Sequence, residues 1–185
     1  MLLDLFRTRR SVRRYTEEPL AAEQLDQILE AALLAPTSKN SRAWRFVVVQ
    51  DRETLLKLSE AKPQGASFVK HAAAAVVVCG DEQESEAWIE DCAVAAFALH
   101  LEAHDLGLAS CWVQLRGREY NEQKSAPAYV RELLHLPEQM QPLALVAMGH
   151  PGDSKKPHDP SELRFDQVSR EQFGTPWRTG TPWRA

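Results

Sequence analysis

An arginine-rich segment near the N-terminus is the first part of this sequence that could do chemistry. Residues 7–14 contain Arg7, Arg9, Arg10, Arg13 and Arg14, with Ser11 among them, in a chain whose net charge is −4. Because like charges at this density repel one another, an anion is expected nearby. Guanidinium groups match phosphate oxygens and stay charged at any relevant pH. The segment indicates a phosphate site, although a solvated basic face paired with Glu17 and Glu18 would have the same composition.

A second polar cluster lies at residues 35–44, between the expected end of a helix and the start of a strand. Its sequence is Ala-Pro-Thr-Ser-Lys-Asn-Ser-Arg-Ala-Trp. Thr37, Ser38 and Asn40 supply several donors and acceptors within four positions, which is enough to bind ring heteroatoms or a polyol. An ordinary turn after a helix also favours Pro, Ser and Asn. Taken alone, this loop does not distinguish the two.

Hydrophobic periodicity predicts the elements that must position these clusters. Leu25, Ile28, Leu29 and Ala32 recur at helical spacing, and Pro36 ends that helix. Gly107 stands where a left-handed helix cap belongs. The expected helices cover residues 3–9, 20–34, 52–61, 85–105 and 127–135, and the expected strands cover 44–50, 73–79, 109–115 and 143–148.

Composition excludes several classes of protein. The net charge of −4 argues against general binding to nucleic acid or anionic membranes. No apolar run reaches the roughly 20 residues that span a bilayer. Cys79, Cys92 and Cys111 form no Cys-x-x-Cys pair, which favours buried, reduced thiols and a cytoplasmic location. His100 and His104 stand four residues apart without a visible third ligand, so no metal site is expected.

The C-terminal part of the chain has a different character. No linker divides the sequence, so residues 1–185 are expected to form one domain, with residues 151–185 as an extended tail. The tail carries prolines at 151, 157, 160, 176 and 182 and little periodicity. A segment that cannot build its own core is expected to wrap another chain, most simply a second copy. Trp177 and Trp183 are expected to anchor the tail on that partner.

The two polar clusters together resemble the nitroreductase family of FMN-dependent oxidoreductases. Arg-Arg-Ser-Val-Arg at 9–13 is followed by Ala-Pro-Thr-Ser-x-Asn-Ser-x-x-Trp at 35–44. The segments 107–112 (GLASCW) and 145–151 (LVAMGHP) are similar to later motifs of that family, in the same order. The resemblance covers nearly the whole chain. It implies an α+β fold with a mixed, mainly antiparallel sheet flanked by helices, in an interlocked homodimer with exchanged C-terminal segments and FMN at the interface.

The resemblance also implies a set of cofactor-binding residues. Arg9, Arg10, Ser11 and Arg13 match contacts to the phosphate and ribityl chain. Pro36, Thr37, Ser38 and Asn40 match a loop that reaches the flavin from the partner subunit. Val113 and Gln114 match backbone contacts beside the flavin ring. A basic residue of the tail is expected to complete the phosphate site, either Lys156 or Arg164.

Two features depart from the family pattern. Arg42 and Ala43 stand where the family usually has Gln and Pro, so Arg42 is expected to add positive charge near the cofactor. Positive charge favours the anionic reduced flavin, which predicts a raised reduction potential. The polar stretch 115–126 is longer than a hairpin needs, and is expected to be either a lid over the substrate pocket or a disordered surface loop. Within it, Arg116, Arg118 and Tyr120 are candidates to meet an acidic or nicotinamide-phosphate group.

The resemblance implies hydride transfer from NADH or NADPH through the flavin to a small organic acceptor, such as a nitroaromatic or a quinone. No side chain is expected to act as a catalytic acid or base, since the cofactor does the chemistry. Three alternatives stay open. These are other flavin chemistry (dehalogenation, enone reduction or flavin breakdown), a non-enzymatic FMN-binding or regulatory protein, and a flavin-free protein that binds nucleic acid or phosphopeptides through its basic segment.

Overall fold

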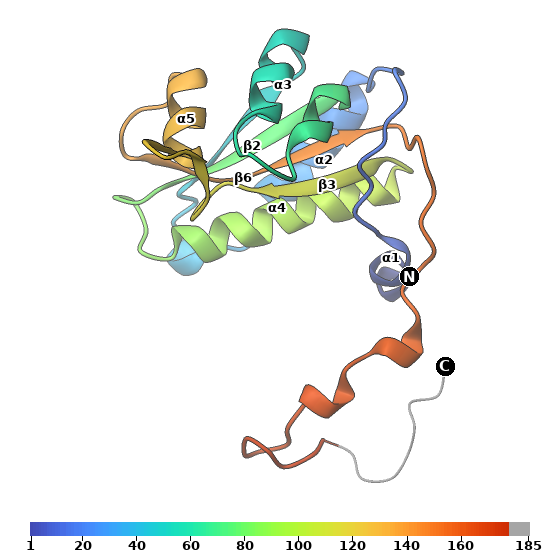
Figure 1. Ribbon diagram of the computed structural model, residues 1–185. Helices are drawn as coiled ribbons and strands as arrows, with labels where there is room; N and C mark the ends of the chain where they lie inside the picture. The colour runs from blue at the N-terminus through green and yellow to red at the C-terminus, as the bar shows by residue number, and fades with distance from the viewer. Residues whose placement is uncertain (178–185) are drawn as a thin grey trace.

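A four-stranded sheet forms the centre of the protein, for which a computed structural model describes residues 1–177 (Figure 1). The strand order is β1 (Trp44–Val49), β2 (Ala74–Asp81), β6 (Met140–Gly149), β3 (Ala109–Gln114), and all neighbours are antiparallel. A parallel bridge between Ser11 and Ser110 adds the N-terminal segment to the outer edge of β3. The sheet is therefore mixed but mainly antiparallel, as predicted.

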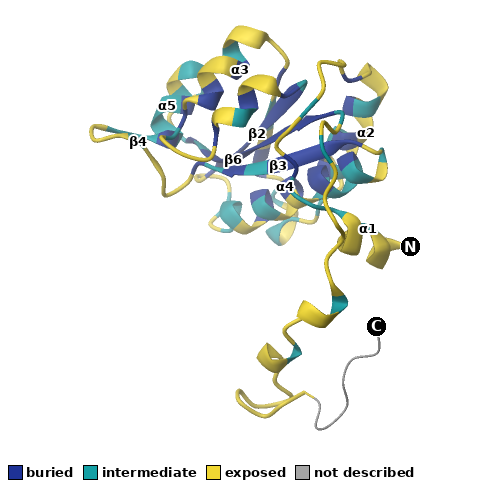
Figure 2. Ribbon diagram, turned by 45° about the vertical axis from the view of Figure 1, so that its right-hand side comes forward, coloured by how far each residue is buried: buried dark blue, intermediate teal, exposed yellow. Residues whose placement is uncertain are grey.

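Helices cover both faces of this sheet. α2 (Ala22–Leu33) and α4 (Trp88–Asp105) lie on one face, and α3 (Arg52–Ser59), the short helix η2 (Ser67–His71) and α5 (Ala126–Leu133) lie on the other. Side chains alternate between the two cores along each strand. On β2, Val76 and Val78 pack with α2 and α4, while Val77 packs with α3 and α5. Figure 2 shows the central strands buried between the two layers. α1 (Leu2–Thr8) lies against α4.

All the predicted helices and strands are present, with differences at their ends. The helix expected from residue 85 begins at Trp88, because Asp81 holds a turn before it. The Oδ1 of Asp81 accepts hydrogen bonds from the backbone N–H groups of Gln83 at 2.9 Å and Glu84 at 3.3 Å. The last strand begins earlier than expected, at Met140, and accommodates Pro142 where the register with β2 shifts.

The polar stretch 115–126 is an ordered hairpin, so the expectation of a disordered loop is wrong. β4 (Glu119–Asn121) pairs with β5 (Lys124–Ser125) in antiparallel fashion. The ring of Tyr120 stacks on Tyr129 of α5, with centroids 4.1 Å apart. This aromatic contact between the hairpin and α5 holds the hairpin on the body of the protein, and the sequence pattern does not reveal it.

The tail leaves the body of the protein after β6 (Figure 1). It contains the short turns η3 (Pro160–Glu162) and η4 (Phe165–Gln167) and is largely exposed (Figure 2). Apolar side chains such as Leu163, Val168 and Trp177 are exposed along it. Trp183 lies outside the described residues. Within residues 1–177, no helix is both long and apolar enough to cross a membrane.

Candidate functional site

The arginine-rich segment is an extended arm, residues 9–13, on the outer edge of β3. Its middle is fixed by the Ser11–Ser110 bridge and by the backbone N–H of Val12, which donates to the Ser110 carbonyl at 3.1 Å. Side chains of an extended segment alternate in direction. Burial raises the pKa of the Cys111 thiol, and Arg13, Ser11 and Arg9 each act to lower it, so these three side chains face Cys111. The side chain of Val12, between them, is buried. The arm therefore presents Arg9, Ser11 and Arg13 together on one side.

These guanidinium groups have no carboxylate partners in the part of the chain that is described. Arg9 and Arg13 form no ion pair, and the alternative pairing with Glu17 and Glu18 is not observed. Glu18 faces His150 instead, at 3.7 Å. Burial, followed by repulsion from Arg10, lowers the pKa of Arg9. A partly buried cation without a partner is costly, which indicates that an anion completes the site.

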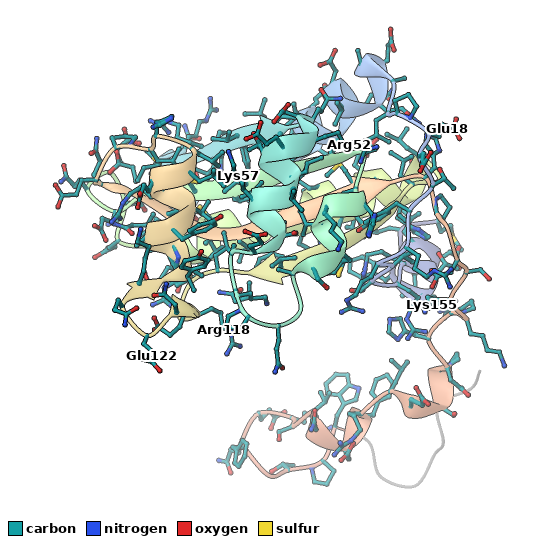
Figure 3. The ribbon with its side chains drawn as sticks, turned by 45° about the horizontal axis from the view of Figure 1, so that its top comes forward. Glu18, Arg52, Lys57, Arg118, Glu122 and Lys155 are labelled. Atoms are coloured by element: carbon teal, nitrogen blue, oxygen red, sulfur yellow. The ribbon has the colours of Figure 1, made fainter. Side chains whose placement is uncertain are left out.

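The fold adds Lys62 to this cationic group. Burial, then repulsion from Arg118, and to a smaller extent Arg13, lowers the pKa of Lys62. Lys62 lines an open hollow together with Gln114 and Arg118. Figure 3 shows Arg118 at the hairpin, directly before β4. Sequence analysis missed Lys62, because a single lysine far from the arm carries no local signal.

Arg10 points away from the other arm residues and toward the start of the tail. Its guanidinium Nη1 donates to the backbone carbonyl of Lys156. The backbone N–H of His158 donates to the Arg7 carbonyl at 2.8 Å, and that of Gly152 donates to the Arg14 carbonyl at 2.8 Å. Arg10 thus helps to hold the tail where it leaves the sheet.

The two tail candidates for the phosphate site differ in position. The backbone of Lys156 lies beside the arm, through its contact with Arg10. Arg164 lies further along the tail, and its guanidinium is engaged by Asp166 at 2.7 Å. Within the chain, the structure brings Lys156 close to the arm and leaves Arg164 apart from it.

The strand residues after Trp112 lie on the free edge of the sheet. The side chain of Val113 is fully buried, so only its backbone is available to a ligand. Gln114 accepts a hydrogen bond from Trp112 Nε1 at 2.9 Å and lines the hollow with Lys62. The bridge to the arm involves only Ser110 among the β3 residues. Beyond it, the outer edge of β3 offers unpaired backbone groups within the described chain.

The loop at residues 36–42 contains the short helix η1 (Ser38–Asn40) and forms its own network. The backbone N–H of Arg42 donates to Thr37 Oγ1 at 3.1 Å, and Arg42 Nε donates to Asn40 Oδ1 at 3.1 Å. Pro36, Asn40 and Arg42 are exposed. The loop is therefore preformed and presents its polar groups outward.

The arm and the loop lie at opposite ends of α4 and at opposite edges of the sheet (Figure 1). Asp91, in the first turn of α4, binds the loop through Ser38 and Ser41. His104, in the last turn, lies 2.8 Å from Thr8 Oγ1, just before the arm. At about 1.5 Å per residue, these two points are roughly 20 Å apart along the helix. The two predicted clusters consequently do not meet within one chain.

His100 is a buried histidine whose role could not be read from the sequence. Its Nδ1 lies 2.8 Å from Ser110 Oγ, and its ring stacks on Trp112 with an interplanar angle of 11°. Burial, helped by the charge of Arg9, lowers the pKa of His100 to about 4. The imidazole is therefore neutral at pH 7 and supports the residue on which the arm is docked.

The chain belongs to the nitroreductase family, whose sequence pattern matches residues 6–150. A relative from Archaeoglobus fulgidus, which carries the provisional name NADH dehydrogenase/NAD(P)H nitroreductase, is 38% identical over 92% of this chain and 98% of its own length. An FMN reductase [NAD(P)H] of Bacillus subtilis is 32% identical over 83% of this chain and 68% of its own. Among solved structures, an FMN-dependent nitroreductase from Clostridium difficile R20291 superimposes with a TM-score of 0.91, at 39% identity, over 92% of this chain and 99% of that chain.

Proposed function

We propose that this protein is an FMN-dependent oxidoreductase that takes hydride from NAD(P)H and passes it to a small organic acceptor, such as a nitroaromatic or a quinone. Membership of the nitroreductase family supports this function, as do the names of the relatives from B. subtilis and C. difficile. The observation that carries it is the arm docked beside a free strand edge, on which Arg9 is partly buried and neither Arg9 nor Arg13 has a carboxylate partner among the described residues.

The residues of the arm fit the phosphate end of FMN. Arg9 and Arg13 are cationic at all relevant pH values, share one side of the arm with the Ser11 hydroxyl, and have no ion pair among the described residues. Lys62 and the unpaired backbone edge of β3 fit the polar atoms of a flavin ring, and the hollow lined by Gln114 and Arg118 fits the nicotinamide or the acceptor. Lys156 is the better placed of the two tail candidates for completing the phosphate site.

When bound, FMN supplies the hydride chemistry, and the residues of this chain orient the reactants and exclude water. The arm holds the phosphate, and the hairpin closes one side of the hollow next to Gln114. Lys62 and Arg118 outnumber Glu119 in the lining of the hollow, and this excess of positive charge favours donors and acceptors that carry an anionic group.

A homodimer is part of the proposal, since the arm and the loop of one chain lie too far apart to share a ligand. Apolar side chains on α1 and α4 are exposed in the single chain, including Phe6 and Phe97, whose rings are 5.6 Å apart. The tail carries further exposed apolar groups away from its own sheet. Pairing two chains through α4, with the tails exchanged, would cover these groups and bring the loop of each subunit to the arm of the other. The free thiols of the buried cysteines fit a reducing compartment such as the cytoplasm.

The test is cofactor binding by the purified protein. We expect a yellow protein whose released cofactor has the mass of FMN, and whose flavin absorption bleaches anaerobically when NADH or NADPH is added. Arg9→Gln should weaken FMN binding by about 10–100-fold, because it removes charge-assisted hydrogen bonds of roughly 1.5–3 kcal/mol. Arg14→Gln is the matched control, one residue beyond the arm, and should bind FMN normally. A colourless protein that does not take up added FMN would contradict the proposal.

A further inference from the structure

The loop at 37–42 has a backbone that needs external support. Lys39, Asn40 and Arg42 have φ values of 52°, 55° and 51°. These values lie in the left-handed region, which is unfavourable for most residues other than glycine. Such residues persist only where the surroundings hold them in place. The bonds within the loop, from Arg42 to Thr37 and Asn40, tie it to itself but not to the rest of the protein.

Asp91 supplies the buried link between this loop and the body of the protein. Its Oδ1 accepts a hydrogen bond from the backbone N–H of Ser38 at 2.9 Å, and its Oδ2 accepts one from Ser41 Oγ at 3.3 Å. The side chain is 5% exposed and forms no ion pair with any described residue. It stands in the first turn of α4, where the helix dipole favours a carboxylate.

The other links from this loop to its surroundings are exposed to solvent. At the end of the loop, Arg45 Nη1 of β1 donates to the Arg42 carbonyl at 3.0 Å. Lys39 pairs with Glu86 at 3.3 Å, but both side chains are more than four-fifths exposed. An ion pair in that setting contributes little to holding a backbone conformation, because water screens it. Asp91 therefore carries the attachment.

We propose that Asp91 is a positioning residue for FMN, which sets the loop conformation that meets the cofactor. The inference rests on the proposed function. Asp91 accepts the hydrogen bond of the Ser38 N–H, and Arg42 donates one to Asn40 Oδ1. The polar groups of the loop that remain available to a ligand include the hydroxyl of Ser38 and the amide NH₂ of Asn40. A loop locked in this way offers donors to the carbonyl oxygens and ring nitrogens of a flavin.

The test compares Asp91→Ala, Asp91→Asn and Ser41→Ala with a matched control, Asp51→Ala. Asp51 also accepts one backbone N–H and one hydroxyl, both from Thr54, but it does so at the start of α3, away from the loop. Hydrogen exchange of the Ser38 amide in the cofactor-free protein reports the loop, and exchange of the Val77 amide in β2 reports global unfolding. The FMN dissociation constant measures how tightly the site holds the cofactor, and the visible circular dichroism of the bound flavin reports its surroundings.

Asp91→Ala should speed exchange at Ser38 by at least about tenfold relative to Val77 and raise the FMN dissociation constant by about 10–100-fold. Asp91→Asn keeps an acceptor for the Ser38 N–H and should restore part of both losses, and Ser41→Ala should give a smaller loss. Asp51→Ala should leave Ser38 exchange and FMN binding unchanged. If Asp91→Ala fails to fold, Asp91→Asn and Ser41→Ala decide the question.

Unchanged Ser38 exchange and FMN affinity in the Asp91 variants, with a wild-type protein that binds FMN, would overturn the role of Asp91 alone. Equal losses in Asp51→Ala would overturn it too, since the effect would then follow general destabilisation. A wild-type protein that does not bind FMN would overturn the proposed function itself, and the role of Asp91 with it.

Discussion

Single polar side chains on α4 decide where the two parts of the candidate site stand. Asp91 binds the loop, His100 binds Ser110 beneath the arm, and His104 contacts Thr8. Asp91 and His100 are buried, and buried polar groups are kept only where they are hydrogen-bonded, so these two residues tie surface segments to the core. His104 is only partly buried and adds a contact at the other end of α4. In the sequence they appear as an acid and two histidines within a helix, with no sign of what they hold.

His100 makes stability depend on pH. The fold keeps its imidazole neutral down to a pKa of about 4, whereas in the unfolded chain it takes up a proton near pH 6.5. Between these values the unfolded state binds more protons, so this contribution is complete above pH 6.5 and is lost as the pH falls toward 4. The loss should reach at most about 3 kcal/mol.

Urea unfolding of the cofactor-free protein at pH 7, 6 and 5 measures this dependence. His100→Asn keeps a polar atom near Ser110 but cannot titrate, and its stability should fall less over this range. Equal slopes for the wild-type protein and His100→Asn would show that His100 is not the group responsible.

At the scale of elements, the close approach of β2 and α4 depends on a glycine. A Cβ atom built on Gly80 would lie 2.6 Å from Cε3 of Trp88, the first residue of α4. Residues of α4 contact the loop at one end and the segment before the arm at the other. The distance between α4 and the sheet therefore affects the position of both. A glycine within a strand often marks a place where another element packs closely, but the sequence does not show which element that is.

Gly80→Ala should therefore destabilise the protein by about 1–3 kcal/mol through overpacking, measured by urea unfolding. Part of the cost should be relieved when Trp88 is also replaced by Leu, since the ring atom at 2.6 Å is then gone while the Cβ of residue 88, at 2.9 Å, stays. Gly107→Ala is a useful comparison, because its φ of +74° imposes a backbone cost with no atom within 4 Å of the added Cβ. The overpacking explanation fails if Gly80→Ala costs the same with and without Trp88.

At the scale of the whole molecule, the single chain leaves an apolar surface on α1 and α4. It also leaves apolar side chains exposed along the tail, beyond the residues that bond to the arm. The separation of the arm and the loop gives both features a common explanation in a homodimer. Phe97 is 38% exposed and contacts Phe6, so both side chains belong to that surface. A charge at this position would be buried on association and would oppose it.

Phe97→Glu should shift the protein from dimer to monomer in light scattering after size-exclusion chromatography, and FMN affinity should fall together with the dimer. Leu56→Glu is the control, because Leu56 is comparably exposed but lies on α3, on the opposite face of the sheet. A wild-type monomer that binds FMN, or a Phe97→Glu variant that remains dimeric, would contradict this arrangement.

Local pattern was sufficient to predict the helices and strands and the buried cysteines, and to single out the two clusters that we propose to contact the cofactor. Apolar spacing reports which face of an element is buried, and the charges of residues 9–13 and the polar groups of residues 36–42 are visible wherever the chain places them. These features depend on neighbours in sequence, so the sequence by itself determined them.

Only the tertiary structure decided which groups act together. It turned Arg10 toward the tail and away from Arg9 and Arg13, and added Lys62 to the cationic group. It also placed the loop and the arm at opposite ends of α4. Each of these outcomes depends on contacts between residues far apart in the chain, and a pattern of neighbouring residues contains no information on such contacts.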